Sequence, residues 1–135
     1  MHSHKLNNSD ALKFIFAGNS TVTFLNTKTS NRFTFKVKKS KNSNFYFVSV
    51  LTNPEMYQYI GTVVDDIFTH GKKSKISLDA QSVRTFEYVL TKLKINNLPD
   101  FIEVWHEGKC GKCGKKLTDP ISIERGYGPF CVALV

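Results

Sequence analysis

Hydrophobic and polar residues alternate most clearly in the first half of the chain. Residues 32–38 read Arg-Phe-Thr-Phe-Lys-Val-Lys, so apolar residues take every second position and mostly basic residues take the others. Side chains point alternately to the two faces of a strand, which predicts a strand with an apolar face inward and a cationic face outward. The β-branched or apolar runs 21–25, 45–51 and 57–63 predict three further strands. The short polar loops between them favour an antiparallel meander.

The hydrophobic period changes to three or four residues between positions 77 and 95, which predicts one amphipathic helix. Its apolar positions are Val83, Phe86, Val89, Leu90 and Leu93. Ser77 or Asp79 is the expected N-cap, and the Asn-Asn pair before Pro99 is expected to end the helix. This apolar stripe is expected to pack on the sheet.

Two short elements are expected near the C-terminal end. Residues 101–105, Phe-Ile-Glu-Val-Trp, predict a strand that leads directly into His106. Residues 120–125 predict a helix of one or two turns, with Asp119 as N-cap, Pro120 at the first helical position and Gly126 just past the end.

These elements predict an α+β fold, in which an antiparallel β-meander packs with one amphipathic helix and carries a small C-terminal zinc-ribbon or zinc-knuckle segment. The expected organisation is a disordered tail over residues 1–10, a sheet-plus-helix module over 11–100, and a zinc-binding segment over 101–135. The chain has 135 residues, 41% of them hydrophobic and 17 of them aromatic (11 Phe, 5 Tyr and 1 Trp), which is enough for one modest core.

The last segment contains all three cysteines of the chain, in the spacing Cys110-x2-Cys113-x17-Cys131. A Cys-x2-Cys pair places two thiolates on one tight turn at an angle that suits tetrahedral zinc. Glycines follow both cysteines of the pair and allow the backbone to turn back toward the sulfurs. The pattern predicts one structural zinc ion; a redox-active pair and three free thiols are the alternatives.

Three cysteines leave one zinc ligand to be found. His106 precedes Cys110 with the spacing H-x3-C and is the only histidine near the pair, so we expect it to be the fourth ligand. Asp119, Glu107 or water are the alternatives. If water were the fourth ligand and Glu107 a base, the site would resemble a zinc hydrolase. The sequence contains no recognised catalytic motif, and we expect the protein not to be an enzyme.

Residues 104–131 resemble a C-terminal domain of unknown function found in phage, prophage and bacterial proteins. Its pattern, C-G-x-C-G-x-x-L-T-x-P-x-S-x-x-x-G-x-G-P-x-C, is matched at every fixed position from Cys110 to Cys131. The preceding Val-Trp-His-Glu-Gly and, less specifically, the upstream Ala-Gly-Asn at 17–19 also resemble members of this group. The resemblance implies a small zinc-ribbon-like domain and a phage-associated origin, and it implies no activity.

The formal net charge is +8, and the positive charge is concentrated. Residues 11–54 contain seven basic and no acidic side chains, whereas residues 76–105 contain three basic and four acidic ones. Concentrated positive charge attracts polyanions, above all nucleic-acid phosphates. The candidate binding residues are Arg32, Lys36, Lys38, Lys39, Lys41, Lys112, Lys115 and Lys116. Tyr46, Tyr57 and Tyr59 are candidates for stacking on bases.

Two functions remain. The first is binding of DNA or RNA through the cationic sheet face. The second is a phage-encoded module that inhibits or recruits a host protein, for example a defence factor, by docking its basic surface. No apolar run approaches the roughly 20 residues of a membrane span. Three cysteines in knuckle spacing suit a reducing cytoplasm better than a secreted disulfide scaffold, so we expect a protein of the bacterial cytoplasm without a membrane partner.

Overall fold

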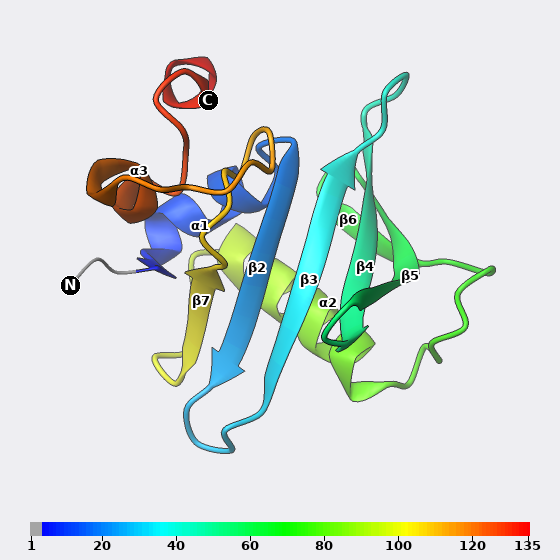
Figure 1. The fold of residues 1–135 in the computed structure, drawn as a ribbon. Coiled ribbons are helices and arrows are strands. Elements are labelled where there is room, and N and C mark those ends of the chain that lie inside the picture. Colours follow the sequence, from blue (N-terminus) through cyan, green and yellow to red (C-terminus); the bar gives the residue numbers. More distant parts are fainter. Residues whose placement is uncertain (1–3) are drawn as a thin grey trace.

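The computed structural model describes residues 4–135 and contains an antiparallel seven-stranded sheet with helices against one of its faces (Figure 1). The spatial order of the strands is β1-β7-β2-β3-β4-β5-β6. Their bounds are β1 (Lys5–Leu6), β2 (Asn19–Asn26), β3 (Arg32–Lys39), β4 (Phe45–Asn53), β5 (Met56–Val64), β6 (Ile67–His70) and β7 (Ile102–His106). The α+β class and the predicted meander are confirmed, because β2 to β5 pair in sequence order.

The alternation that predicted β3 determines which way the sheet faces. Phe35 and Val37 are fully buried, whereas Arg32 and Lys38 are exposed on the opposite face. On β4, Val48 and Val50 continue the buried side, which we call the inner face. The other side, which carries the basic residues of β3, is called the outer face.

Helix α2 (Gln81–Lys94) covers the inner face and lies behind the strands in Figure 1. Its Phe86 ring contacts Phe24, Phe35 and Phe68, at centroid distances of 6.0, 5.0 and 5.3 Å. Three strands are thereby joined to the helix through one aromatic side chain. The predicted stripe is confirmed as a core face, since all five of its members are buried.

The start of α2 differs from the prediction, which placed it at residue 77 with a side-chain cap. The helix begins after Ala80, and no side chain caps it. The Ser77 hydroxyl instead accepts a hydrogen bond from the Asp79 N–H at 3.2 Å, which stabilises a turn before the helix.

The N-terminal residues also differ from the expected disordered tail. From Lys5 onward they form β1, which pairs with β7, and helix α1 (Asn8–Ile15). Ala11, Phe14 and Ile15 are buried at helical spacing, and this burial offsets the entropy of ordering the segment. Residues 1–3, the rest of that expected tail, lie outside the described residues.

Strand β7 changes the expected division at residue 101. It lies inside the sheet, between β1 and β2, and its Ile102 and Val104 belong to the main core. The main-chain hydrogen bonds and apolar side chains of residues 102–106 are therefore shared with the sheet module. The C-terminal segment that lies outside the sheet begins after His106.

Two short helices complete the chain. Helix α3 (Pro120–Arg125) has the predicted bounds: the Asp119 carboxylate accepts from the Ser122 N–H at 3.0 Å, and Gly126 follows with φ 82°. The 3-10 helix η1 (Cys131–Leu134) follows at the C-terminal end. Within residues 4–135, no helix is long and apolar enough to cross a membrane.

The first prediction concerns the aromatic contact between α2 and the sheet. Replacing Phe86 by Ala should lower the free energy of unfolding by roughly 3–5 kcal/mol, because it removes a buried ring shared by three strands. Urea unfolding monitored by the fluorescence of the only tryptophan, Trp105, measures this loss. Phe47→Ala is the matched control, since that ring lies on the outer face and is 42% exposed. Equal losses in the two variants would contradict this assignment of the core.

Candidate metal centre

Cys110 and Cys113 lie in a small hairpin, residues 108–117, that we call the knuckle. The Leu117 N–H donates to the Gly108 carbonyl at 2.8 Å, and the Cys110 N–H donates to the Lys115 carbonyl at 2.8 Å. Between these bonds Lys109 and Lys116 form an antiparallel bridge. The hairpin holds both cysteines of the Cys-x2-Cys pair at its tip, as their spacing predicts.

The two glycines of the knuckle have different roles. Gly114 has φ 79°, a left-handed conformation that L side chains adopt at a cost, and its N–H donates to the Cys110 carbonyl at 2.8 Å. Gly111 is required for packing: a Cβ there would lie 2.6 Å from the ring of Phe14. The turn predicted at Gly114 is confirmed, and Gly111 allows the knuckle to approach α1.

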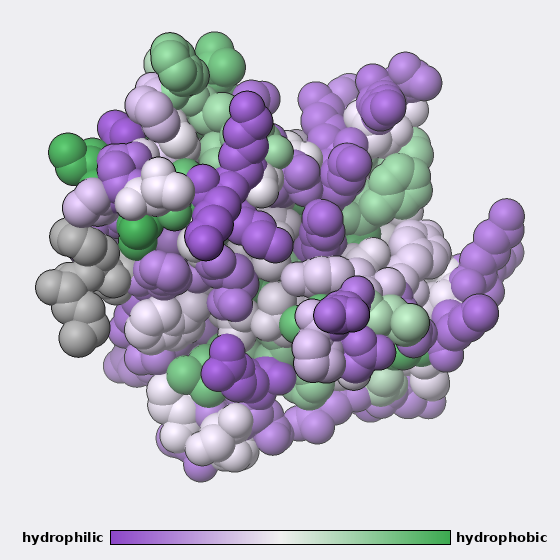
Figure 2. Space-filling view, viewed as in Figure 1, coloured by the Kyte–Doolittle hydropathy of each residue, from purple (hydrophilic) through white to green (hydrophobic). Residues whose placement is uncertain are grey.

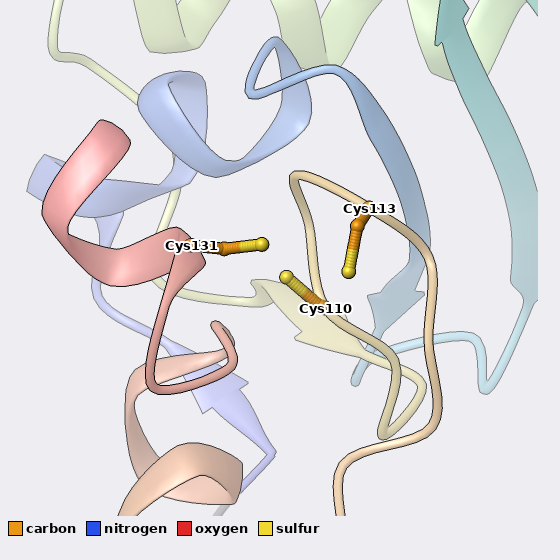
Figure 3. Close-up of side chains that lie close together, drawn as sticks. All are labelled: Cys110, Cys113 and Cys131. Carbon is orange, nitrogen blue, oxygen red and sulfur yellow. The ribbon is translucent and has the colours of Figure 1, made fainter.

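Cys131 approaches the knuckle from the other end of the segment. It begins η1, after the Gly-Pro-Phe sequence at 128–130, and the Val132 N–H donates to the Gly128 carbonyl at 3.0 Å. Figure 3 shows the three cysteine side chains pointing toward one another, two from the knuckle and one from the start of η1.

The three sulfurs fit a metal ion. They lie within 4.8 Å of one another, and all three cysteines are free. Metal–sulfur bonds of about 2.3 Å in a tetrahedron place sulfurs about 3.8 Å apart. Small side-chain adjustments would bring the three sulfurs to that spacing, so this cluster can bind a metal ion.

The backbone favours a thiolate at Cys110. Burial opposes its ionisation, but N–H groups of Gly128, Cys113 and Lys112 and the Cys113 thiol donate toward its sulfur, which lowers the pKa of Cys110 to about 7. Burial and the neighbouring cysteines raise the pKa of Cys131 to about 11. A second thiolate beside the first is disfavoured by repulsion, and a cation among the sulfurs would remove that cost.

The structure does not place His106 among the candidate ligands, contrary to the prediction. Its Nε2 is 2.6 Å from the Ile123 carbonyl, and its Nδ1 accepts from the Gly108 N–H at 3.0 Å. An N–H must donate and a carbonyl must accept, so the ring is neutral with its proton on Nε2. Burial lowers the pKa of His106, in agreement with this state. The reason is strand alternation: His106 follows Ile102 and Val104 on the buried side of β7.

The two alternative carboxylate ligands are also engaged elsewhere. Asp119 caps α3, as described above. Glu107 accepts a hydrogen bond from the Thr23 hydroxyl at 2.8 Å on the outer face of the sheet. Among residues 4–135, the only group of three or more potential metal ligands is the cysteine cluster. Glu107 is not among the residues that line the pocket beside the cysteines.

The predicted basic residues fall into two groups. Arg32, Lys36 and Lys38 lie on the outer face of β3, with Lys39 and Lys41 at the hairpin that follows. The remaining three lysines, Lys112, Lys115 and Lys116, belong to the knuckle. The Asn19 N–H donates to the Gly111 carbonyl and the Lys39 N–H donates to the Gly18 carbonyl, each at 2.9 Å. The knuckle and the β3–β4 hairpin therefore lie at the same end of the sheet (Figure 1).

The candidate stacking residues are separated by the structure. Tyr46 donates its hydroxyl to the Phe16 carbonyl at 2.9 Å and packs on the Phe16 ring, so it is a structural residue. Tyr57 and Tyr59 pair with outer-face positions of β4 and line the outer face. Trp105 lies on the same face, opposite Thr23, and was not among the predicted stacking residues. The alternation of residues 101–105 would have predicted that its side chain lies on the outer face.

Comparison with known proteins finds one family. The sequence profile of a family of unknown function (DUF6011) matches residues 105–135, which agrees with the expected resemblance to an uncharacterised family. The match covers the segment with the three cysteines. The phage origin stays a prediction. No curated protein and no solved structure gives a significant match to the chain.

The second prediction separates the cysteines from His106. Cys131→Ser should lose most of the bound metal, because it removes one of three ligands, whereas His106→Gln should keep about one metal per chain. Glutamine retains a side-chain N–H near the position that donates to Ile123. Elemental analysis of folded, chelator-free protein gives the metal-to-protein ratio. Loss of metal in His106→Gln with an intact fold would restore His106 as a ligand.

Proposed function

We propose that this protein binds single-stranded nucleic acid across the outer face of its sheet and that a structural zinc ion holds its C-terminal segment in place. The observation that carries the proposal is the basic strand β3, which lies on the face opposite α1 and α2 with aromatic side chains on both sides. The proposed role is binding.

The basic residues of β3 form a track along the strand. Arg32, Lys36 and Lys38 alternate with buried residues and share the outer face. The Lys36 ammonium is 5.8 Å from the centre of the Tyr57 ring. Cations occupy three of the four outward positions from 32 to 38, and Thr34 occupies the other. Such a row can follow a phosphate backbone, and each neutralised phosphate releases counterions.

Aromatic rings flank this track. Trp105 on β7 lies on one side, and Phe47, Tyr57 and Tyr59 on β4 and β5 lie on the other. Stacking of a base on an aromatic ring contributes about 1–3 kcal/mol and depends little on sequence. The combination favours splayed single strands over duplexes, whose bases are already stacked.

The lysines of the knuckle and of the β3–β4 hairpin extend the positive surface beyond the sheet. Figure 2 shows hydrophilic residues over much of this side of the molecule. At the upper end, two parts of the surface project, with a notch between them. Figure 1 places the knuckle on one side of this notch and the hairpin on the other. A single-stranded nucleic acid that runs along β3 would pass between the knuckle and the β3–β4 hairpin. Among the acidic side chains nearby, Glu103 on β7 pairs with Lys5 at 3.1 Å. Asp65 and Asp66 follow the end of β5, which pairs with the start of β4 beside the hairpin.

Zinc is the ion that best suits the cysteine cluster. Thiolate ligands select zinc, copper(I) or iron–sulfur clusters, and a Cys-x2-Cys knuckle with N–H groups directed at sulfur is typical of zinc. The segment after His106 buries few large side chains of its own, so metal binding should contribute much of its folding free energy.

Binding to a host protein is the second candidate. The observation that favours it is the apolar surface beside the cysteine cluster: Phe130 is 87% exposed, and Leu134 on η1 is 70% exposed. Exposed apolar side chains of this kind mark interaction sites when they lie together. A pull-down from host lysate with and without nuclease separates the two functions.

The third prediction tests the basic track. Wild-type protein should bind random single-stranded oligonucleotides, with an affinity that falls steeply between low and moderate salt. Replacing Arg32, Lys36 and Lys38 by Glu should abolish this binding at both salt concentrations, with folding intact, because these side chains point away from the core. Fluorescence polarisation measures binding, and quenching of Trp105 reports contact with the outer face.

A charge-matched control lies on the helix side of the sheet. Replacing Arg84, Lys92 and Lys94 on α2 by Glu changes the net charge by the same amount but leaves the outer face intact. This variant should retain most of the affinity. No binding by the wild type at low salt ends the nucleic-acid proposal, and equal losses in the two triple variants reduce it to a general charge effect.

A further inference from the structure

We infer that the metal centre is a three-cysteine site whose fourth coordination position opens into a pocket for a small anion with a thiolate or carboxylate donor. This inference rests on the proposed zinc binding. It concerns the ligand that completes the coordination of the ion, whereas the role proposed for zinc above is to hold the C-terminal segment in place.

The first step is that the nearby protein donors have other partners. Both ring nitrogens of His106 are hydrogen-bonded to backbone groups, the Asp119 carboxylate caps α3, and the Glu107 carboxylate binds Thr23. Within the described chain, the cluster of possible ligands contains three sulfurs and no fourth donor. A tetrahedral ion held by these sulfurs would take its last ligand from outside the described residues.

The second step is the pocket. Cys110, Cys113 and Cys131 all line one pocket of about 290 Å³, so an ion bound to the three sulfurs would face this space. Cys113 is itself exposed, which places the cluster at the surface and accessible to small molecules. Structural zinc sites are normally closed by four protein ligands, and an open position is the feature of sites that exchange ligands.

The third step is the chemistry of the walls. Lys115 and Lys116 line the pocket and supply two positive charges against the one carboxylate of Asp119, which also lines it. Leu117, Pro129 and Phe130 supply apolar surface. The buried Ser122 side chain lies behind this wall next to the Asp119 carboxylate, whose pKa its hydrogen bond lowers. The walls therefore suit a small organic anion, with one atom on the metal and a second anionic group near the lysines.

The coordination number is tested on the wild-type protein. X-ray absorption of the zinc protein should show three sulfur neighbours and one light neighbour, without the outer-shell scattering of an imidazole ring. His2 lies outside the described residues, and His2→Ala should leave this spectrum unchanged. Four sulfur neighbours, or imidazole scattering, would show that the fourth position is closed and would overturn the inference.

The ligand class is tested on the cobalt-substituted protein, whose visible spectrum reports ligand exchange. Titration with mercaptoacetate should give a saturable, one-to-one spectral shift; the ligand binds as its thiolate and gives its proton to the buffer. Cysteamine, a thiol with a positive charge in place of the carboxylate, should bind at least several-fold more weakly. A spectrum that mercaptoacetate does not change overturns the inference.

Matched variants identify the pocket. Lys115→Glu with Lys116→Glu should remove the preference for mercaptoacetate, whereas Lys109→Glu with Lys112→Glu, in the same knuckle but outside the pocket lining, should retain it. Equal preference in the two double variants overturns the assignment of the anion to this pocket. Protein that binds no metal overturns both this inference and the zinc proposal, while bound zinc with four protein ligands overturns this inference alone.

Discussion

The position of the C-terminal segment depends on its contacts with the ring of Phe14. A Cβ on Gly111 would lie 2.6 Å from this ring and one on Gly126 would lie 2.8 Å from it, so both the knuckle and the end of α3 approach it directly. His106 and Tyr127 contact the same ring at centroid distances of 5.8 and 5.5 Å. The Gly111 N–H donates to the Gly126 carbonyl at 3.0 Å beside it. One buried aromatic residue of α1 therefore fixes the relative position of the two chain segments that supply the cysteines.

The strands with strict alternation could be predicted from the sequence because one buried face fixes their register. The pattern of residues 32–38 and the Asp-Pro-…-Gly frame of α3 each specify a local structure with few alternatives. Helix α1 was missed because it has only eight residues, of which three, Ala11, Phe14 and Ile15, are buried at helical spacing. Strands β1 and β6 are too short to show a period, and their pairing depends on distant partners.

The cysteine cluster was predictable from spacing, whereas the role of His106 was not. Proximity in sequence suggested His106, but the period of β7 already placed that residue on the same face as Ile102 and Val104. The chain turns at Gly108, the first residue of the knuckle, where φ is 79°. The two ring nitrogens of His106 are hydrogen-bonded to the Ile123 carbonyl and the Gly108 N–H. Its role follows from tertiary contacts: it joins β7 to α3 and stacks on His4 at 4.6 Å.

The metal centre and the basic face are joined through the start of β2. The Asn19 N–H bonds to the Gly111 carbonyl in the knuckle, and the adjacent Gly18 carbonyl accepts from Lys39 at the end of β3. Gly18, in the turn before β2, and Asn19, the first residue of β2, thus set the distance between the knuckle lysines and the hairpin lysines. The sheet has its own aromatic core around Phe86, so we expect it to fold without a bound metal. With the function proposed above, loss of the metal should leave the basic residues of β3 in place but allow the knuckle lysines to move. Zinc would then change the extent of the binding surface without abolishing it.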